Sequence, residues 1–360
     1  LYTVNESWQG GKDSGIYVAK IGGEGERRLL PVLSNARYLE PGYLVYGKEG
    51  SLRAHRFDTN RLELTGEPIT LVDGIQYLGL VQSHLFTFSD NGLLAYAQGK
   101  GTLTRLTWVD RKGVVLGTVG GPGSYFTPRV SHDGRRIAYD QSDATTLSGD
   151  IWVVDLDRGI PTRLTFDPQN ESAPIWSPDD ARLLFFRDIS GRSDLFTISS
   201  DGTGQTQTVL SNGSTNLPCD WSGVAKSIVL QVSANKEGGL ADLRLYSTEN
   251  KRIETWLSTP FVQKQARFSP DGRWISYDSD ESGRMEVYVR SISPAGGKWR
   301  VSSNGGGFSV WSRDGREHFY LTPDSRVMSV PIRQGATFEG GTPVPLFKIP
   351  GQILNIGIFT

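Results

Sequence analysis

Short apolar segments alternate with polar turns along the whole chain. The clearest stretch is residues 127–167, in which segments 127–131, 136–140, 150–156 and 162–165 are separated by turns rich in Gly, Asp and Ser. Period-two alternation in segments of this length predicts half-buried β-strands, and the turn residues predict antiparallel hairpins. No stretch has the periodicity of an amphipathic helix. The pattern therefore predicts an all-β protein built from units of four short strands.

A recurring phrase, aromatic-Ser-Pro-Asp-Gly, follows the first strand of each unit. The best copies are residues 268–272 (Phe-Ser-Pro-Asp-Gly) and 176–180 (Trp-Ser-Pro-Asp-Asp). The serines of all copies stand at positions 89, 131, 177, 222, 269 and 312, so that the steps are 42, 46, 45, 47 and 43 residues. A period in this range is typical of a β-propeller with one four-stranded blade per repeat.

The phrase predicts a specific turn chemistry. Asp-Gly favours a primed hairpin turn, because its central residues need positive φ. Ser and Asp side chains are expected to bond the backbone of their own loop, and the aromatic ring is expected to lie between neighbouring sheets.

Seven complete units can be traced, with incomplete ones at both ends. Residues 1–31 supply three outer strands and residues 350–360 supply one, and pairing the two in one sheet would remove exposed strand edges. We predict one propeller domain over residues 1–360, with eight blades and the eighth closed by both termini. Seven blades with loose ends is the alternative. The complete repeats are 35–72, 83–119, 127–167, 173–211, 217–258, 265–304 and 308–348.

Composition narrows the classes of partner. The net charge of −1 and the pI near 6.5 give no basic field for nucleic acid, and no apolar run of about 18 residues exists that would insert into a membrane. The single cysteine, Cys219, excludes an internal disulfide framework and is expected to be a buried thiol. Because the chain starts at Leu1 in mid-strand pattern, we expect a processed piece of a longer protein.

The repeat resembles that of the TolB-type, WD40-like propeller family. In that family a Ser-Pro-Asp-Gly turn recurs with a strand of the type Asp-apolar-Trp/Tyr-apolar. The likeness covers nearly all of the chain and is tightest in residues 127–179 and 265–290.

The chain also resembles the C-terminal propeller of certain bacterial membrane-anchored serine/threonine kinases. Residues 52–58, 62–68, 106–113 and 268–290 carry this likeness. Such propellers follow a transmembrane helix, so the resemblance implies a periplasmic or extracellular location. The kinase motifs Val-Ala-Ile-Lys, His-Arg-Asp and Asp-Phe-Gly do not occur here, so only the non-catalytic part of such a protein would be present.

No catalytic constellation stands out in the sequence. There is no Gly-x-Ser-x-Gly elbow, and the acidic turn residues fall one per repeat rather than in pairs. The four histidines lie in different repeats without metal-ligand spacing, and we expect them in turns or at the surface. These are His55, His84, His132 and His318.

The residue two positions before each phrase serine is a candidate for the mouth of the central channel. Side chains alternate along an inner strand, so if the aromatic residue faces one side, this residue faces the other. The charged residues at this position are Arg129, Asp220 and Arg267, and Arg37 is taken as their equivalent in the first complete repeat. They are expected either to form ion pairs with one another or to bind a peptide terminus or small anion.

The best metal candidate is the loop containing Asp278, Asp280 and Ser282. Oxygen ligands at alternate positions around a Gly turn can wrap Ca²⁺. A plain polar hairpin is the alternative, and no other cofactor is expected.

The favoured function is a non-catalytic binding or sensing propeller with a protein or peptide partner, part of a larger envelope-associated protein. The alternative is an accessory propeller that gates a prolyl-oligopeptidase-like hydrolase. A third possibility is a propeller lyase or glycosidase, which would require acidic or His residues gathered in the channel.

Overall fold

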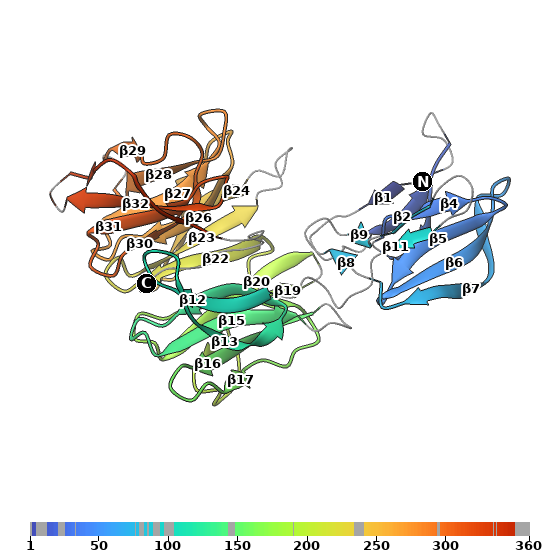
Figure 1. Cartoon of the computed structure of the whole chain (residues 1–360), viewed down its shortest axis with the longest axis horizontal. Coiled ribbons are helices and arrows are strands. Elements are labelled where there is room, and N and C mark those ends of the chain that lie inside the picture. The colour runs from blue at the N-terminus through green and yellow to red at the C-terminus, as the bar shows by residue number, and fades with distance from the viewer. Residues whose placement is uncertain are drawn as a thin grey trace. The chain divides into compact units, whose positions relative to one another are not determined.

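The computed structural model describes 2–4, 13–20, 26–32, 34–75, 77–78, 83–84, 86–88, 94–96, 104–142, 148–189, 191–233, 241–293, 296–333, 335 and 337–349. All regular elements in these ranges are β-strands (Figure 1). The chain forms two compact units, the first from residues 1–104 and 142–147 and the second from 105–141 and 148–360. Among the described residues, no helix is long and apolar enough to cross a membrane.

The first unit holds one four-stranded sheet, one three-stranded sheet and two short hairpins. Apolar side chains of β2 and β5, including Ile16 and Leu44, pack the three-stranded sheet against the four-stranded one. The strands are β1 (Tyr2–Val4), β2 (Gly15–Val18), β3 (Arg27–Leu30), β4 (Arg37–Leu39), β5 (Tyr43–Lys48), β6 (Ser51–Asp58), β7 (Glu63–Asp73), β8 (Tyr77–Leu78), β9 (Ser83–His84), β10 (Phe86–Phe88) and β11 (Leu94–Tyr96).

The second unit holds five antiparallel blades, each with at least four strands, and one two-stranded hairpin. The hairpin is β12 (Thr104–Val109) and β13 (Val115–Gly123). The strands of the first three blades are β14 (Tyr125–Val130), β15 (Arg136–Ser142), β16 (Gly149–Asp155), β17 (Pro161–Arg163), β18 (Glu171–Trp176), β19 (Arg182–Ile189), β20 (Arg192–Ser199), β21 (Gln207–Leu210), β22 (Thr215–Ser222), β23 (Ser227–Ser233), β24 (Ala241–Ser247) and β25 (Ile253–Leu257). Those of the last two are β26 (Gln263–Phe268), β27 (Trp274–Ser279), β28 (Glu286–Ser291), β29 (Lys298–Arg300), β30 (Gly307–Trp311), β31 (Glu317–Leu321), β32 (Arg326–Arg333), β33 (Glu339–Gly340) and β34 (Val344–Lys348).

Apolar clusters join each blade of the second unit to the next. The four clusters between consecutive blades are centred on Trp176, Leu230, Phe268 and Trp311. Because each blade buries its faces against its neighbours, these rings and aliphatic side chains hold the blades together.

The β12–β13 hairpin closes this series of blades into a cycle. On one side, Leu106 and Trp108 of β12 pack on Tyr139 of the β14–β17 blade. On the other side, the Arg111 guanidinium makes two hydrogen bonds of 2.8 Å to the Glu317 carboxylate of β31. The second unit is thus a closed ring of five blades and one hairpin.

The predicted repeats agree with the observed strands to different degrees along the chain. Each of the repeats 35–72, 127–167, 173–211, 217–258, 265–304 and 308–348 contains four or five of the described strands, and those of 173–211 and 217–258 join in one eight-stranded sheet through β20 and β22. Residues 83–119 do not form one four-stranded sheet in the described residues: β10–β11 and β12–β13 are separate hairpins. Residues 350–360 lie outside the described residues, so the shared eighth blade and the blade count of a single domain stay predictions.

The turn device of the phrase recurs with little variation in four blades. In each, the serine hydroxyl donates to the aspartate two residues later at 2.5–2.7 Å and accepts from the backbone N–H five residues later. The prediction of a primed turn, however, is wrong. Positive φ falls on the last residue of the phrase, as at Gly134 and Gly272, and not on the aspartate before it. A serine-anchored turn that ends in one left-handed residue replaces the two-residue primed turn.

Each inner strand of the five blades carries a β-bulge. In four of them the bulge holds a residue of positive φ, between 38° and 56°: Thr127, Ala173, Gln265 and Phe308. A bulge bends the strand and redirects the side chains that follow it, here those just before the phrase.

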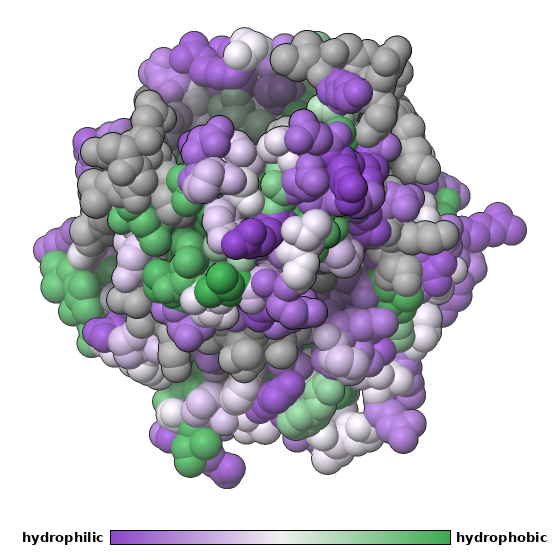
Figure 2. All heavy atoms as spheres, turned by 90° about the vertical axis from the view of Figure 1, so that its right-hand side faces the viewer, coloured by the Kyte–Doolittle hydropathy of each residue, from purple (hydrophilic) through white to green (hydrophobic). Residues whose placement is uncertain are grey.

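Apolar side chains on the surface are scattered. On the face in Figure 2, hydrophobic side chains form small groups among hydrophilic ones. Large exposed apolar residues include Ile69 and Leu71 of β7 and Val115 and Leu116 of β13. Isolated exposure of this kind is normal for folded proteins.

Candidate functional site

Three charged residues of the inner strands lie within electrostatic reach of one another in the second unit. They are Arg129 of β14, Asp220 of β22 and Arg267 of β26, each two positions before its phrase serine. Burial, the largest cause, and the charge of Arg267 together lower the pKa of Arg129 to about 9, although Asp220 and Asp140 oppose the shift. The negative charges nearby thus offset only part of the lost hydration of this guanidinium.

Hydrogen bonds hold the other two members of this group in place. The Asp220 carboxylate accepts from the backbone N–H of Phe268 in the next blade at 2.8 Å. Arg267, buried except for 8% of its surface, donates to the backbone carbonyl of Cys219. These contacts fix one carboxylate and one guanidinium beside the inner-strand backbone.

The same positions also join blades through their backbone. The indole N–H of Trp176 donates to the carbonyl of Arg129 at 2.9 Å, and that of Trp311 donates to the carbonyl of Arg267 at 3.4 Å. Side chains at this position are therefore free to vary while the backbone keeps its structural role. The predicted fourth member, Arg37, belongs to β4 of the first unit.

Two buried aspartates lie beside this group: Asp140, which sequence reasoning missed, and Asp278, which it named only as a candidate calcium ligand. Asp140 accepts hydrogen bonds from the hydroxyls of Thr127 and Ser172, whereas Asp278 accepts one from the N–H of Phe308 at 2.9 Å. Burial raises the pKa of both carboxyls, that of Asp278 to about 7. A Tyr-Asp pair in the second strand of both repeats is the signal that could have found them.

The three residues of the predicted calcium loop take separate partners. Asp278 lies buried between blades, Asp280 accepts from the N–H of Val262 at 2.9 Å, and Ser282 is exposed at the hairpin. Over the described ranges, no group of three or more His, Cys, Asp or Glu side chains could hold a metal ion. A calcium ion here stays a prediction that this geometry does not support.

The histidines and the cysteine divide between surface and core. Cys219 is buried as expected, and His132 lies in an exposed turn. His318 is a correction: it lies in β31, is fully buried beside Trp311, and neither ring nitrogen has a hydrogen-bond partner. Burial lowers its pKa to about 3, so the ring is neutral in the folded protein. The side chain of His84 lies outside the described residues.

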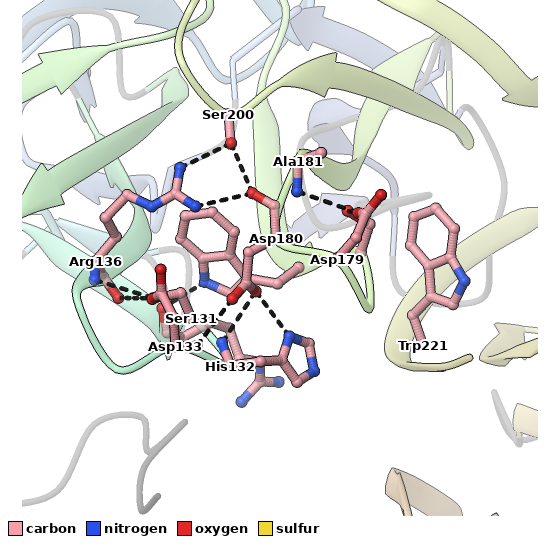
Figure 3. A network of polar contacts seen from close by, with 12 residues as sticks. Ser131, His132, Asp133, Arg136, Asp179, Asp180, Ala181, Ser200 and Trp221 are labelled. Atoms are coloured by element: carbon pink, nitrogen blue, oxygen red, sulfur yellow. Dashed lines mark hydrogen bonds and ion pairs between the residues drawn. The ribbon is translucent and has the colours of Figure 1, made fainter. Parts of the chain in front are cut away.

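A polar network joins the turns of two neighbouring blades (Figure 3). The Asp180 carboxylate accepts from the backbone N–H groups of His132 and Asp133 at 2.9 Å and contacts His132 Nδ1 at 2.7 Å. Arg136 lies over the ring of Trp176, with 4.8 Å between Cζ and the ring centroid. We call the boundary between the β14–β17 and β18–β21 sheets, which this network fills, the closed interface.

The fold can be compared with known proteins at this point. A family model for the TolB β-propeller domain matches residues 95–264. The structure is similar to a TolB protein of Agrobacterium tumefaciens, with a TM-score of 0.56 and 18% sequence identity, covering 69% of this chain and 90% of that one. Residues 95–264, a little under half of the chain, are therefore similar to a TolB β-propeller domain. The predicted all-β propeller fold is thereby confirmed. At that level of identity, the structural likeness shows the fold alone.

Two more distant similarities complete the comparison. TolB of Acinetobacter baumannii is 15% identical, with a TM-score of 0.49 over 87% of this chain and 82% of that one. The uncharacterized peptidase YuxL of Bacillus subtilis is 26% identical over 211 residues, which are 45% of this chain and 31% of that protein. The chain thus matches about a third of the length of this curated relative. None of these proteins is a kinase, so the kinase resemblance stays a prediction.

Proposed function

We propose that this propeller is a non-catalytic binding module for a protein or peptide partner, within a larger envelope-associated, periplasmic or extracellular protein. The group of Arg129, Asp220 and Arg267 supports this proposal most strongly. It would receive an anionic group of the partner, such as a C-terminal carboxylate.

The charges of this group favour an anion. The charge of Arg267 lowers the pKa of Arg129, and the Asp220 carboxylate is already engaged by the N–H of Phe268. A bound carboxylate would add negative charge beside Arg129 and accept hydrogen bonds from it. Arg129 and Asp220 are both partly exposed, so a ligand can approach them.

Isothermal titration of the full chain with short acetylated peptides tests this proposal. We expect peptides with a free C-terminal carboxylate to bind, and the same peptides with a C-terminal amide to bind at least tenfold more weakly. Arg129→Met should reduce the affinity for the free-carboxylate peptides by a similar factor.

Arg158→Met is the matched control, because Arg158 is an exposed arginine in the outer hairpin of the same blade. It should leave binding unchanged, and thermal unfolding would verify that both variants fold. Equal affinity for carboxylate and amide peptides, or full binding by Arg129→Met, would refute an anion site on the inner strands.

A second candidate function rests on the similarity to the peptidase-named relative. An accessory propeller of a hydrolase would accompany a separate domain with a Gly-x-Ser-x-Gly nucleophile elbow. Sequencing the complete parent gene tests this: such a domain would support gating, and a parent protein without one would exclude it.

A further inference from the structure

A cavity of about 270 Å³ lies between the β26–β29 and β30–β34 sheets. Trp274, Trp311 and Phe338 line it, and each of these rings is at least nine-tenths buried. We call this boundary the open interface. About 150 Å³ is enough to hold a benzene-sized group in a protein interior, so the cavity has room for a side chain.

The closed interface shows what occupies the corresponding space. Counted from the phrase serine, Arg136 stands five residues after Ser131, and Trp274 stands five residues after Ser269. Arg136 places its guanidinium over Trp176, which corresponds to Trp311. A planar cation over an indole face is a favourable pairing.

The second partner of the closed interface is also replaced. Asp180 stands three residues after its serine, and the corresponding residue is Gly315. The Asp180 backbone carbonyl accepts from Arg136 at 2.9 Å, and its carboxylate bonds the preceding turn. At these two positions the open interface therefore lacks a guanidinium and a carboxylate, and it retains the indole of the phrase and the backbone carbonyl at Gly315. The guanidinium that crosses it is that of Arg273, which donates to the carbonyl of Gly335 at 2.8 Å.

Trp274 does not take over the role of Arg136. Its ring packs edge-on against Trp299, with centroids 5.3 Å apart, and against Phe338 at 6.1 Å. Trp311 also lines the cavity, and its ring packs edge-on against Phe338 at 6.1 Å and beside His318 at 4.6 Å. Only the part of the indole that faces the cavity is therefore available to a group from outside.

Charged residues surround the mouth of the cavity. Asp271 and Asp314, the turn aspartates of the two blades, have 41% and 62% of their side chains exposed. Of the two arginines at the mouth, Arg273 is bound to Asp271 at 2.6 Å and Arg333 to Glu339 at 3.3 Å. An entering cation would meet arginines that are already paired with carboxylates.

We propose that the open interface is a docking pocket for an arginine side chain of a partner polypeptide, with its guanidinium over Trp311 in the way that Arg136 lies over Trp176. The proposal rests on the proposed function only in that the partner is a polypeptide. The pocket lies on different blades from Arg129, so the two sites can be tested apart.

The test uses the full chain and the tripeptide acetyl-Gly-Arg-Gly-amide, which has no free carboxylate. Binding is followed through the indole N–H signals of Trp274 and Trp311 in ¹H–¹⁵N NMR spectra, assigned by single substitution. We expect millimolar binding that shifts both signals. The citrulline analogue, equal in shape but uncharged, should bind at least tenfold more weakly, and the lysine analogue should be intermediate.

Two variants sharpen this test. Trp311→Leu should weaken binding at least tenfold, whereas Trp221→Leu, at the same phrase position of another blade, should not change it. The double variant Trp274→Arg with Gly315→Asp places the closed-interface pair in the open interface, so it should abolish binding while the protein stays folded. This second variant still reports on the pocket if Trp311→Leu fails to fold.

Three results would overturn or localise the proposed arginine pocket. Equal binding of the arginine and citrulline peptides, or shifts confined to signals other than Trp274 and Trp311, would overturn the pocket as a guanidinium site. Absence of binding at 20 mM, roughly 2.3 kcal/mol, would do the same. Arg129→Met should leave arginine-peptide binding unchanged, so carboxylate binding that survives in this variant would count only against the inner-strand site.

Discussion

The closed and open interfaces occupy corresponding places between consecutive blades, but their contents differ. In the closed interface Arg136 and Asp180 make hydrogen bonds across the boundary. In the open interface Trp274 and Gly315 stand at those positions and a cavity remains. The blade and its turn are thus the same at both interfaces. The residues three and five positions after the serine differ, and with them the presence of a cavity between the blades.

The same contrast extends to the inner strands. Ser172 donates to Asp140 at 2.8 Å in the closed interface, whereas the corresponding residue before the bulge in the open interface is Gly307. Asp278 therefore lacks a hydroxyl donor there, and its Oδ1 has no hydrogen-bond partner. His318, also without a partner, lies in the same interface. The open interface combines a cavity with two poorly satisfied titratable groups.

The largest expected effect is at Asp278. Its folded pKa of about 7 lies above the unfolded value of 3.8, so the folded state holds a proton that the unfolded state releases. Stability is therefore lost as pH rises from about 4 to about 7, by up to roughly 4 kcal/mol at about 1.4 kcal/mol per unit. Asp278→Asn should remove this slope and raise stability at pH 8, as measured by urea unfolding at several pH values.

Asp140→Asn is the matched variant in the closed interface. The pKa of Asp140 is also raised, but hydrogen bonds from Thr127 and Ser172 favour its ionised form. Its replacement should therefore flatten the pH dependence less than Asp278→Asn does. Equal slopes for the two variants would show that the donors at Asp140 do not matter.

Asp180→Gly should convert the closed interface towards the open one. It removes the acceptor of two turn N–H groups, and leaving such groups unsatisfied costs about 1–3 kcal/mol. Relief of the positive φ of 55° at this residue offsets part of that loss. We expect a net loss of about 2 kcal/mol in urea unfolding, and an unchanged free energy of unfolding would mean that the network of Figure 3 contributes nothing.

Sequence alone predicts the parts of this fold that each repeat must satisfy locally. The serine and aspartate of the phrase, and aromatic rings such as Trp176, are required in every copy, so their spacing reveals the blades. That spacing also gives Arg129, Asp220 and Arg267 the same position on their inner strands, whereas their role as a channel-mouth site stays a prediction. A pair such as Arg136 and Asp180 could not be predicted, because it depends on contacts between residues 44 positions apart.

The burial of His318 could not be predicted for a related reason. The strand Glu-His-Phe-Tyr-Leu places one polar residue on each face, Glu317 on one and His318 on the other, so the sequence permits either face to be buried. Which face meets the neighbouring blade depends on the packing across the open interface, where the His318 ring lies beside Trp311. The pattern of residues within one strand carries no information on the packing between two blades.

His318→Leu should reduce the loss of folding stability at acid pH that the buried histidine of the open interface causes. The folded pKa of about 3 lies below the unfolded value of 6.5, so the unfolded state takes up a proton that the folded state does not. Stability is thus lost as pH falls through 6.5, by roughly 2 kcal/mol between pH 7 and pH 5. The leucine variant should lack this loss in thermal unfolding at the two pH values. His132→Gln, at an exposed turn, is the control and should retain it.

The smallest effect is expected from Gly315→Asp alone. Gly315 has a φ of 69°, and Asp180 shows that aspartate adopts a similar φ of 55° at the corresponding position. The new carboxylate can reach the N–H of Asp271, but residue 270 is a proline and offers no second donor. With one hydrogen bond gained and a positive φ imposed, we expect the free energy of unfolding to change by less than about 1 kcal/mol. Trp274→Arg alone should destabilise the protein, because it removes a ring buried against Trp299 and Phe338. Gly315→Asp should offset part of that loss when the two are combined, because the guanidinium then gains its partner, and a double-mutant cycle measures that coupling. A coupling of zero would mean that the two interfaces differ in more than these two positions.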